Sequence, residues 1–227
     1  MIKIDQGFLI NKLKYNENSI IADFYTRENG RISGIIFGGT SKKIKGYLEI
    51  GNYFHLNLNS KNETRVSSIK AEIIKAYTPI YFNNQKKLYS IISAMSLIKN
   101  LTPENENNFN IFNLIQNFFN LLEKNNWLKN YINWELKLLK YLGYDLNLKN
   151  IVEKEIVNNK EVFYVKSSTQ KKAVPNFLVN ENIEKVEYYE ILRGFTIVSS
   201  YMEKNIFTPN NLKVPIQRME FENLLNK

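Results

Sequence analysis

The sequence predicts an α+β protein in which a five-stranded barrel is followed by a mainly α-helical C-terminal domain. Two observations lead to this class: apolar and polar residues alternate up to about Tyr77, and the apolar period changes to 3.6 residues after Pro79. The chain has 227 residues, of which 44% are hydrophobic, so each part can bury a core.

The N-terminal region shows the two-residue period of half-buried strands. In "NSIIADFYTR" and "NYFHLNLN" apolar side chains occupy every second position, and residues 64–74 repeat the pattern. Asn29 and Gly30 form a tight-turn signal between two such runs, and a short helix is expected near residues 43–48. Five strands with one helical interruption fit a small closed barrel, and the OB-fold is the favoured arrangement.

Beyond Pro79 the apolar residues recur at helical spacing. One stripe runs through residues 88–98 and another through residues 112–122, and Thr102, before Pro103, is expected to cap the second helix. Further helices are expected at about 131–142, at about 186–207 and from Pro215 onward.

The helical region has one polar interruption. Residues 147–182 contain "EVFYV" and "KKAVPNFLV", which suit a hairpin. The sequence therefore predicts two domains: a barrel over 1–79, and a helical domain over 80–227 with this hairpin as an insertion.

The charge of the chain favours an anionic partner. The formal net charge is +9 with a pI of about 9.4. Residues 1–80 carry 12 Lys and Arg against 7 Asp and Glu, and the remaining residues carry 19 against 15, so charge is concentrated in the barrel region. The sequence has no cysteine, no run of about 20 apolar residues and no signal-peptide pattern, so a cytoplasmic location is expected.

The residue types of catalysis form no constellation. The single histidine, His55, stands at an alternating strand position, and Glu135 has no partner acid nearby in the sequence. Gly34 and Gly39 have the spacing of a phosphate loop, but Thr40 stands where that loop needs lysine. A protein that is not an enzyme, without cofactor or metal, is expected.

In one stretch of the predicted barrel, "RENGRISGIIFGGTSKKIKG", two adjacent glycines are followed by three lysines within four residues. The glycines would allow close approach of a ligand, and the lysines fall within one helical turn. The candidate nucleic-acid-binding residues are Arg27, Arg31, Gly38, Gly39, Lys42, Lys43 and Lys45. Base-stacking candidates are Tyr15, Tyr25, Phe37 and Tyr53. The alternative is a solvated loop with these rings in the core.

Several segments follow one another in the order of a known family. Residues 17–21 carry a Glu-x-Ser-x-hydrophobic strand, and the next strand and turn carry Phe24, Thr26, Glu28, Gly30 and Arg31. The segment "WELKLLKYLGYD" is similar to a family helix that ends in Leu-Gly-Tyr, and "YVKSSTQKKAV" and "YMEKNIFTPNNLKVP" are similar to later segments. Together they resemble the RecO family of bacterial recombination mediators over nearly the whole chain.

The resemblance implies an N-terminal OB-fold, a helical C-terminal domain and a non-enzymatic role in DNA repair and homologous recombination. Members of this family bind single- and double-stranded DNA and anneal complementary strands. They contact the single-strand binding protein SSB and act with RecR to load RecA onto SSB-coated DNA. The resemblance therefore implies association with the nucleoid.

Two features depart from the family pattern. Some relatives carry a cysteine zinc site after the Leu-Gly-Tyr helix, whereas this chain has no cysteine. Relatives often carry arginines that dock the acidic SSB tail where this chain has Ile132 and Asn133. Tail contact would then use the residues around the third helix, namely Lys129, Trp134, Lys137, Leu138 and Lys140.

Two other functions remain open on sequence grounds. A general single-stranded DNA- or RNA-binding OB-fold module would have the same barrel and charge. A protein-interaction adaptor would use the helical domain instead.

Overall fold

The protein is described by a computed structural model that covers residues 2–59, 67–157, 160–166, 171–183 and 185–227. The chain divides into two compact units. The first unit consists of Met1–Gln116 and Pro215–Leu224, and the second consists of Asn117–Val214 and Leu225–Lys227.

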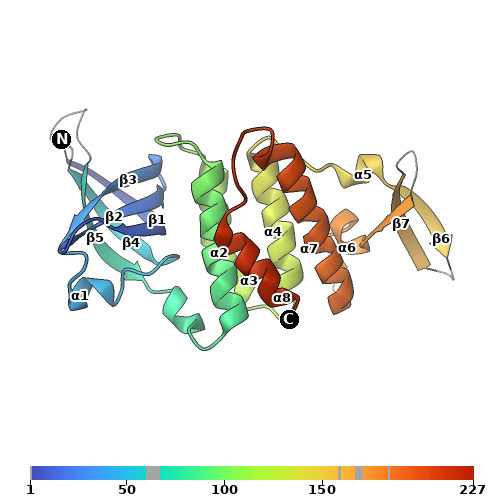
Figure 1. The fold of residues 1–227 in the computed structure, drawn as a ribbon, viewed down its shortest axis with the longest axis horizontal. Coiled ribbons are helices and arrows are strands. Elements are labelled where there is room, and N and C mark those ends of the chain that lie inside the picture. Colours follow the sequence, from blue (N-terminus) through green and yellow to red (C-terminus); the bar gives the residue numbers. More distant parts are fainter. Residues whose placement is uncertain (1, 60–66, 158–159, 167–170, 184) are drawn as a thin grey trace. The chain divides into compact units, whose positions relative to one another are not determined.

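Five strands of the first unit form a closed barrel (Figure 1). They are β1 (Ile2–Lys14), β2 (Ser19–Thr26), β3 (Gly30–Phe37), β4 (Tyr53–Asn59) and β5 (Ser68–Lys75). Their order is β1-β2-β3-β5-β4, and β3 pairs with β5 in parallel while the other neighbours are antiparallel. The helix α1 (Lys42–Lys45) lies between β3 and β4. The predicted OB-fold barrel is confirmed, and so is the helical interruption between its third and fourth strands.

The barrel closes around the side chains that alternation places on its inner face. Phe24 of β2 and Phe54 of β4 are fully buried, with ring centroids 5.7 Å apart in an edge-to-face arrangement. The other buried members of this core are Leu9, Ile20, Ala22, Ile32, Ile36, Leu48, Leu56 and Ile69. The two-residue period read from the sequence therefore gives the inner face directly.

Helices complete the first unit. They are the 3-10 helix η1 (Thr78–Tyr81), α2 (Gln85–Leu101), the first part of α3 (Phe109–Leu122) and most of α8 (Ile216–Leu225). The sequence suggested that Thr102 is the N-cap of the helix now labelled α3. This expectation is wrong, because Thr102 lies at the C-terminal end of α2. Its hydroxyl donates to the Ile98 carbonyl at 2.7 Å. Asn108 takes the capping position of α3, where its Oδ1 accepts from the backbone N–H of Asn110 at 3.1 Å.

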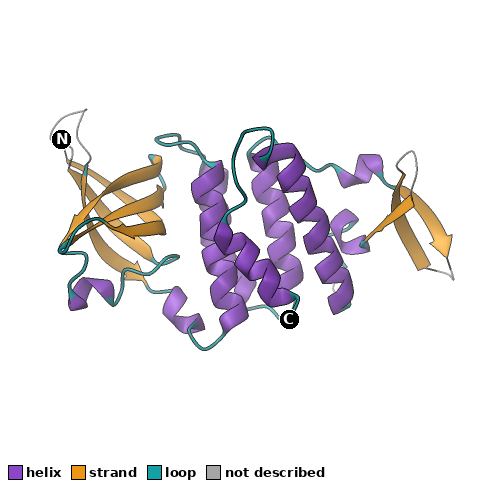
Figure 2. Ribbon diagram, in the orientation of Figure 1, coloured by secondary structure: helices purple, strands orange, loops and turns teal. Residues whose placement is uncertain are grey.

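The second unit is helical with a small sheet (Figure 2). Its helices are the end of α3, α4 (Trp127–Tyr141), α5 (Leu148–Ile151), α6 (Asn176–Val179) and α7 (Tyr188–Met202), which continues as the π-helix η2 (Glu203–Phe207). Its sheet has the order β6 (Glu153–Val157), β7 (Lys160–Lys166) and β8 (Lys171–Val174). It has one strand more than the hairpin expected there.

The core of the second unit is aromatic. The Phe118 ring meets Trp134 at 5.1 Å, and Tyr131 stacks on Phe195 of α7 at 6.2 Å. Within the described ranges, no helix has the length and apolar character that crossing a membrane requires.

Candidate nucleic-acid interface

A groove of about 380 Å³ opens at one end of the barrel. The end of β1, the turn that follows it, the loop after β3 and the helix α1 form its walls. Ile20 and Leu48, both buried, provide an apolar floor, while Lys14 and Lys45 are exposed at the rim. A groove of this kind can hold an apolar ring against its floor and an anion at its edge.

Hydrogen bonds fix the walls of the groove. The Thr40 hydroxyl donates to the Glu17 carbonyl at 2.7 Å, which ties the loop after β3 to the turn after β1. Lys12 Nζ donates to the Leu48 carbonyl at 2.6 Å and pairs with Glu49 at 2.9 Å. The ammonium group of Lys12 is therefore paired within the protein. Lys14 and Lys45 also line the groove, and their side chains are exposed to solvent.

The two glycines of the loop have structural roles. Gly38 has a φ of +72°, which glycine adopts without strain. Gly39 is buried, and a Cβ there would lie 2.8 Å from Cγ1 of Ile20 and 3.1 Å from the Ile36 carbonyl. The bare backbone at Gly39 therefore makes room for the barrel core, whereas the sequence suggested room for a ligand.

Two of the four candidate stacking rings are exposed on segments that form the walls of the groove, although neither lines it. Phe37, at the end of β3, is 66% exposed, and Tyr15, after β1, is 57% exposed. Lys42 of α1 is also exposed, while Lys43 belongs to α1 with its side chain outside the described residues. Exposed rings beside exposed lysines are the combination by which OB-folds bind single strands.

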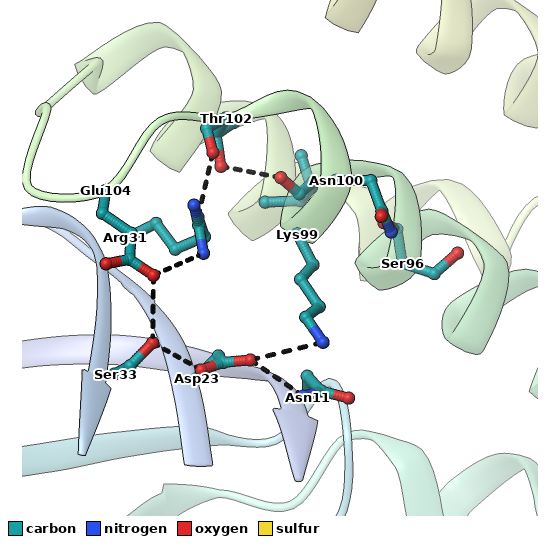
Figure 3. Close-up of polar contacts among 10 residues, drawn as sticks. Asn11, Asp23, Arg31, Ser33, Ser96, Lys99, Asn100, Thr102 and Glu104 are labelled. Atoms are coloured by element: carbon teal, nitrogen blue, oxygen red, sulfur yellow. Dashed lines mark hydrogen bonds and ion pairs between the residues drawn. The ribbon is translucent and has the colours of Figure 1, made fainter. Parts of the chain in front are cut away.

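Arg31 does not contribute to this groove, contrary to the sequence-based expectation. Its Nε donates to the Thr102 carbonyl at 2.9 Å, and its Nη1 pairs with Glu104 at 2.9 Å. The side chain is only 17% exposed. The guanidinium is therefore held by the segment after α2 (Figure 3).

A further set of polar contacts connects β1, β2 and β3 with α2 (Figure 3). Asp23 accepts from the Ser33 hydroxyl at 2.6 Å and from Asn11 Nδ2 at 2.8 Å. Lys99 of α2 approaches the other side of this carboxylate, at 3.7 Å. The contacts of Arg31 itself leave its guanidinium paired within the protein and mostly buried.

We predict that Arg31→Ala lowers the free energy of unfolding by about 2 kcal/mol, because two hydrogen bonds with a charged donor are lost. Urea denaturation measures this loss. The salt dependence of DNA binding should stay that of the wild type. If the Arg31→Ala protein folds but its DNA affinity depends less steeply on salt concentration than that of the wild type, Arg31 contacts a phosphate after all.

Tyr25 is fully buried, so it does not offer a ring for stacking as the sequence suggested. Its hydroxyl donates to the Asn108 carbonyl at 3.3 Å, and burial raises its pKa from 10.0 to about 12. The fold thus favours the neutral phenol. The stability that this provides is complete below the unfolded pKa and is lost as pH rises from about 10 toward about 12. Comparing alkaline unfolding of wild type and Tyr25→Phe tests this, because the variant should lose less stability in that window.

Arg27 and Tyr53 lie away from the groove. Tyr53 begins β4 and pairs with Phe8 in the middle of β1, whereas the groove is lined by residues 12–14 at the end of β1 and does not include Tyr53. The Tyr53 ring stacks on Phe8 at 4.5 Å, and burial raises its pKa. Arg27 lies over the ring of Phe109 at 5.7 Å. Arg27 follows β2 and the α1 lysines follow β3, and these two strands are antiparallel, so the candidate residues of that one stretch are divided between two ends of the barrel.

In the second unit, three of the residues expected to contact the SSB tail are buried. Lys129, Trp134 and Leu138 are 3%, 3% and 0% exposed. Lys129 Nζ donates to the carbonyls of Glu181 and Ile183 at 2.7 and 2.8 Å. These side chains stabilise the unit and present no surface, which corrects the expectation for them.

Lys137 and Lys140 are exposed and line a pocket of about 180 Å³. They pair with Glu181 at 3.0 Å and Asp145 at 3.9 Å. Other lining residues are Leu136, Leu146, Leu178 and Lys149. The sequence did not reveal Lys149 or Leu178, because α5 and α6 bring them beside α4 from distant parts of the chain.

Ile132 and Asn133 are 0% and 7% exposed. Oδ1 of Asn133 is buried without a hydrogen-bond partner in the part of the chain that the structure describes. Neither side chain offers a cation at the surface.

Comparison with known proteins agrees with the barrel and the helical part. The family described as "Recombination protein O N terminal" matches residues 1–77, and the family "Recombination protein O C terminal" matches residues 83–207. The chain belongs to the recombination protein O family. This confirms the resemblance to RecO and supports a role in DNA repair and recombination.

Curated relatives of the RecO family span almost the same length. The chain is 29% identical to the DNA repair protein RecO of Rickettsia canadensis over 91% of this chain and 90% of the relative. It is 28% identical to those of Rickettsia felis, over 98% of both chains, and of Rickettsia bellii, over 98% of this chain and 96% of the relative.

A solved structure of an Entamoeba histolytica asparaginyl-tRNA synthetase overlaps 94% of this chain and 59% of its own, with a TM-score of 0.28 and 11% identity. An overlap this poor supports no statement about the RecO fold.

Proposed function

We propose that the protein is a non-enzymatic recombination mediator that binds single- and double-stranded DNA in the barrel groove and anneals complementary strands. With RecR it would help to load RecA onto SSB-coated DNA, in the cytoplasm beside the nucleoid. The observation that supports this proposal best is the groove itself. It joins an apolar floor to a lysine rim on the OB-fold of a RecO family member.

The groove suits strands that must be held and released. Lys14, Lys42 and Lys45 are exposed cations for phosphates, and such contacts carry no base information. Tyr15 and Phe37 offer exposed rings on which any base can stack. Binding that ignores sequence is what annealing of arbitrary complementary strands requires.

Annealing is tested with two complementary labelled oligonucleotides, without nucleotide or metal. We expect the protein to accelerate duplex formation and a chelator to leave the rate unchanged. A chelator that abolished annealing would contradict the metal-free mechanism. Parallel titrations with RNA decide between DNA and general single-strand binding. A protein that bound neither nucleic acid would be an adaptor.

For the SSB partner, we propose the pocket beside α4 as the docking site of its acidic, apolar-ended tail. Lys137, Lys140 and Lys149 would attract the acidic residues, and Leu136 and Leu178 would contact the apolar end. The wild-type protein is expected to bind this tail weakly, because Lys137 and Lys140 already have acidic partners.

The docking proposal predicts that Lys137→Glu with Lys149→Glu reduces affinity for the tail peptide at least tenfold at low salt. Calorimetry measures the affinity at two salt concentrations. The control variant is Lys124→Glu, an exposed lysine of the same unit that does not line the pocket. Tight binding that ignores salt and both variants would mean a different, mainly apolar site.

A further inference from the structure

The outer face of the barrel carries apolar side chains on three neighbouring strands. We call Leu13, Ile21, Ile35 and Phe37 the outer row. Leu13 of β1 pairs with Ile21 of β2, and Ile21 pairs with Ile35 of β3, so these three lie side by side. Phe37 follows Ile35 by two residues on β3 and therefore points to the same face.

A bulge in β1 decides which side chains form this row. The pairing of β1 with β2 shifts between Leu9 and Asn11, which reverses the alternation of the strand. Lys12 consequently pairs with Ala22, a core residue, and Leu13 turns to the outer face. Lys12 and Leu13 thus lie on opposite faces of the same strand end.

The outer row is accessible to solvent. Leu13 is 56% and Phe37 66% exposed, while Ile21 and Ile35 are half-buried. Among the residues that the structure describes, no other ring and no cation contacts the Phe37 ring. Its face is therefore free for a ligand. Contiguous apolar side chains that stay exposed on a folded domain mark an interaction site.

A polar row bounds the outer row on one side. Asn11, Asp23 and Ser33 occupy the next outward positions of β1, β2 and β3, and the Asp23 carboxylate accepts a hydrogen bond from each of the other two. Lys99 lies 3.7 Å from that carboxylate. The charge of this acid is therefore compensated, and it does not repel a polyanion on the outer row.

The size of the outer row argues against a protein partner. A protein interface of standard size takes about 20–30 residues from each side. The outer row is narrow, because the polar row begins at the next position of each strand. Its three strands span about 10 Å at about 4.8 Å between strands. This is the length of about three nucleotides at roughly 3.4 Å per phosphate.

The charges at the edge of the outer row suit a nucleic-acid strand. Leu13 also lines the groove, where the exposed Lys14 and Lys45 offer cations for phosphates. OB-folds bind oligonucleotides with the face of their second and third strands, and bases stack on exposed rings there. In a duplex the bases are already stacked inside the helix, so a sheet face reaches only the phosphates.

We propose that the outer row distinguishes single strands from duplex DNA. The lysines of the groove bind the phosphates of either form, whereas only an unpaired base lies flat on Phe37 and its aliphatic neighbours. The outer row thus provides the part of single-strand affinity that does not depend on salt. This inference rests on the proposed function, and deepens it by naming the residues that favour single strands.

Strands without bases test the inference on the full-length protein. The probes are a thymidine oligomer of about twelve nucleotides, an abasic strand and a duplex, all of equal length. At equal salt, the wild type should bind the thymidine strand roughly tenfold or more tightly than the abasic strand. Leu13→Thr with Phe37→Thr, which keeps strand-forming residues, should bind these two strands alike and keep the wild-type salt slope. Its affinity for the duplex should fall less than about twofold.

A matched control uses exposed apolar residues outside the outer row. Ile4→Thr with Phe82→Thr also replaces one aliphatic and one aromatic side chain, which are 74% and 54% exposed, and should keep the wild-type preference for thymidine. Phe37→Leu is the milder variant, because it keeps an apolar side chain and loses only the ring. It should reduce that preference roughly threefold or more. Thermal melting checks that each variant folds.

The outcomes separate this inference from the proposed function. Equal affinity of the wild type for thymidine and abasic strands overturns the inference and leaves the groove. So does a folded outer-row variant that keeps the full preference, or one that loses duplex affinity equally. Binding of no nucleic acid by the wild type overturns the proposed function itself.

Discussion

Replacing Lys14, Lys42 and Lys45 together with alanine is expected to weaken single-strand binding by roughly two orders of magnitude at about 0.1 M salt. Each phosphate contact on a single strand contributes about 0.7 to the slope of log affinity against log salt. Loss of three contacts lowers the slope by about 2. It removes a factor of about 100 in affinity at 0.1 M relative to 1 M salt.

The effect should be the same for every base sequence, because phosphate contacts do not read bases. The fold should survive, since exposed lysines contribute little to stability. Fluorescence anisotropy at four salt concentrations measures the slope, and thermal melting checks folding. A control triple variant, Lys3→Ala with Lys70→Ala and Lys124→Ala, removes equal charge elsewhere. If the groove variant folds and keeps the wild-type slope, the phosphates bind elsewhere.

The strands of the barrel could be predicted because their cause is local. Alternation decides which side chains face the core, and Asn29 with Gly30 decides where β2 turns into β3. A short helix was expected near residues 43–48, and the structure has it at Lys42–Lys45, where the Ser41 hydroxyl accepts from the Ile44 N–H at 3.4 Å. The capping of α3 was misread, because Thr102 and Asn108 are both plausible caps and only tertiary packing decides between them.

The site could be predicted only in part, because exposure depends on distant residues. Arg31 looked free in the sequence, yet its partners Thr102 and Glu104 lie 71 and 73 residues away. Lys129 is held by carbonyls of Glu181 and Ile183, 52 and 54 residues away. Charge composition indicates that a surface is basic, but not which cations the fold has already paired.

The sequence also does not show which lysines of the groove are unpaired. Lys14 ends β1 next to the turn, and nothing in "NKLKY" distinguishes it from Lys12, which is paired with Glu49. The closure of the barrel brings Lys14 beside Lys45. A sequence search for lysines after paired glycines finds only one wall of the groove.

Gly30→Ala is expected to lower the free energy of unfolding by about 3–5 kcal/mol, the largest stability effect that we predict for a single methyl group. Gly30 has a φ of +65° at the turn between β2 and β3. A Cβ there would lie 1.9 Å from the carbonyl oxygen of Glu106 and 3.0 Å from the backbone nitrogen of Asn107. Backbone cannot rotate away as a flexible side chain does, so either the turn or the segment before α3 must move.

Gly38→Ala is the matched control, because it separates backbone strain from collision. Gly38 has a φ of +72°, but the nearest atom to its added Cβ is Ile44 Cδ1 at 3.9 Å. It should therefore lose only the cost of the left-handed conformation, about 1–2 kcal/mol. Urea denaturation of both variants gives the difference, which measures the contact of this turn with Glu106. Equal losses for the two variants would mean that the segment before α3 yields easily and does not hold the turn. A larger loss at Gly30 would show that the segment before α3 cannot move away from the turn without a cost in free energy.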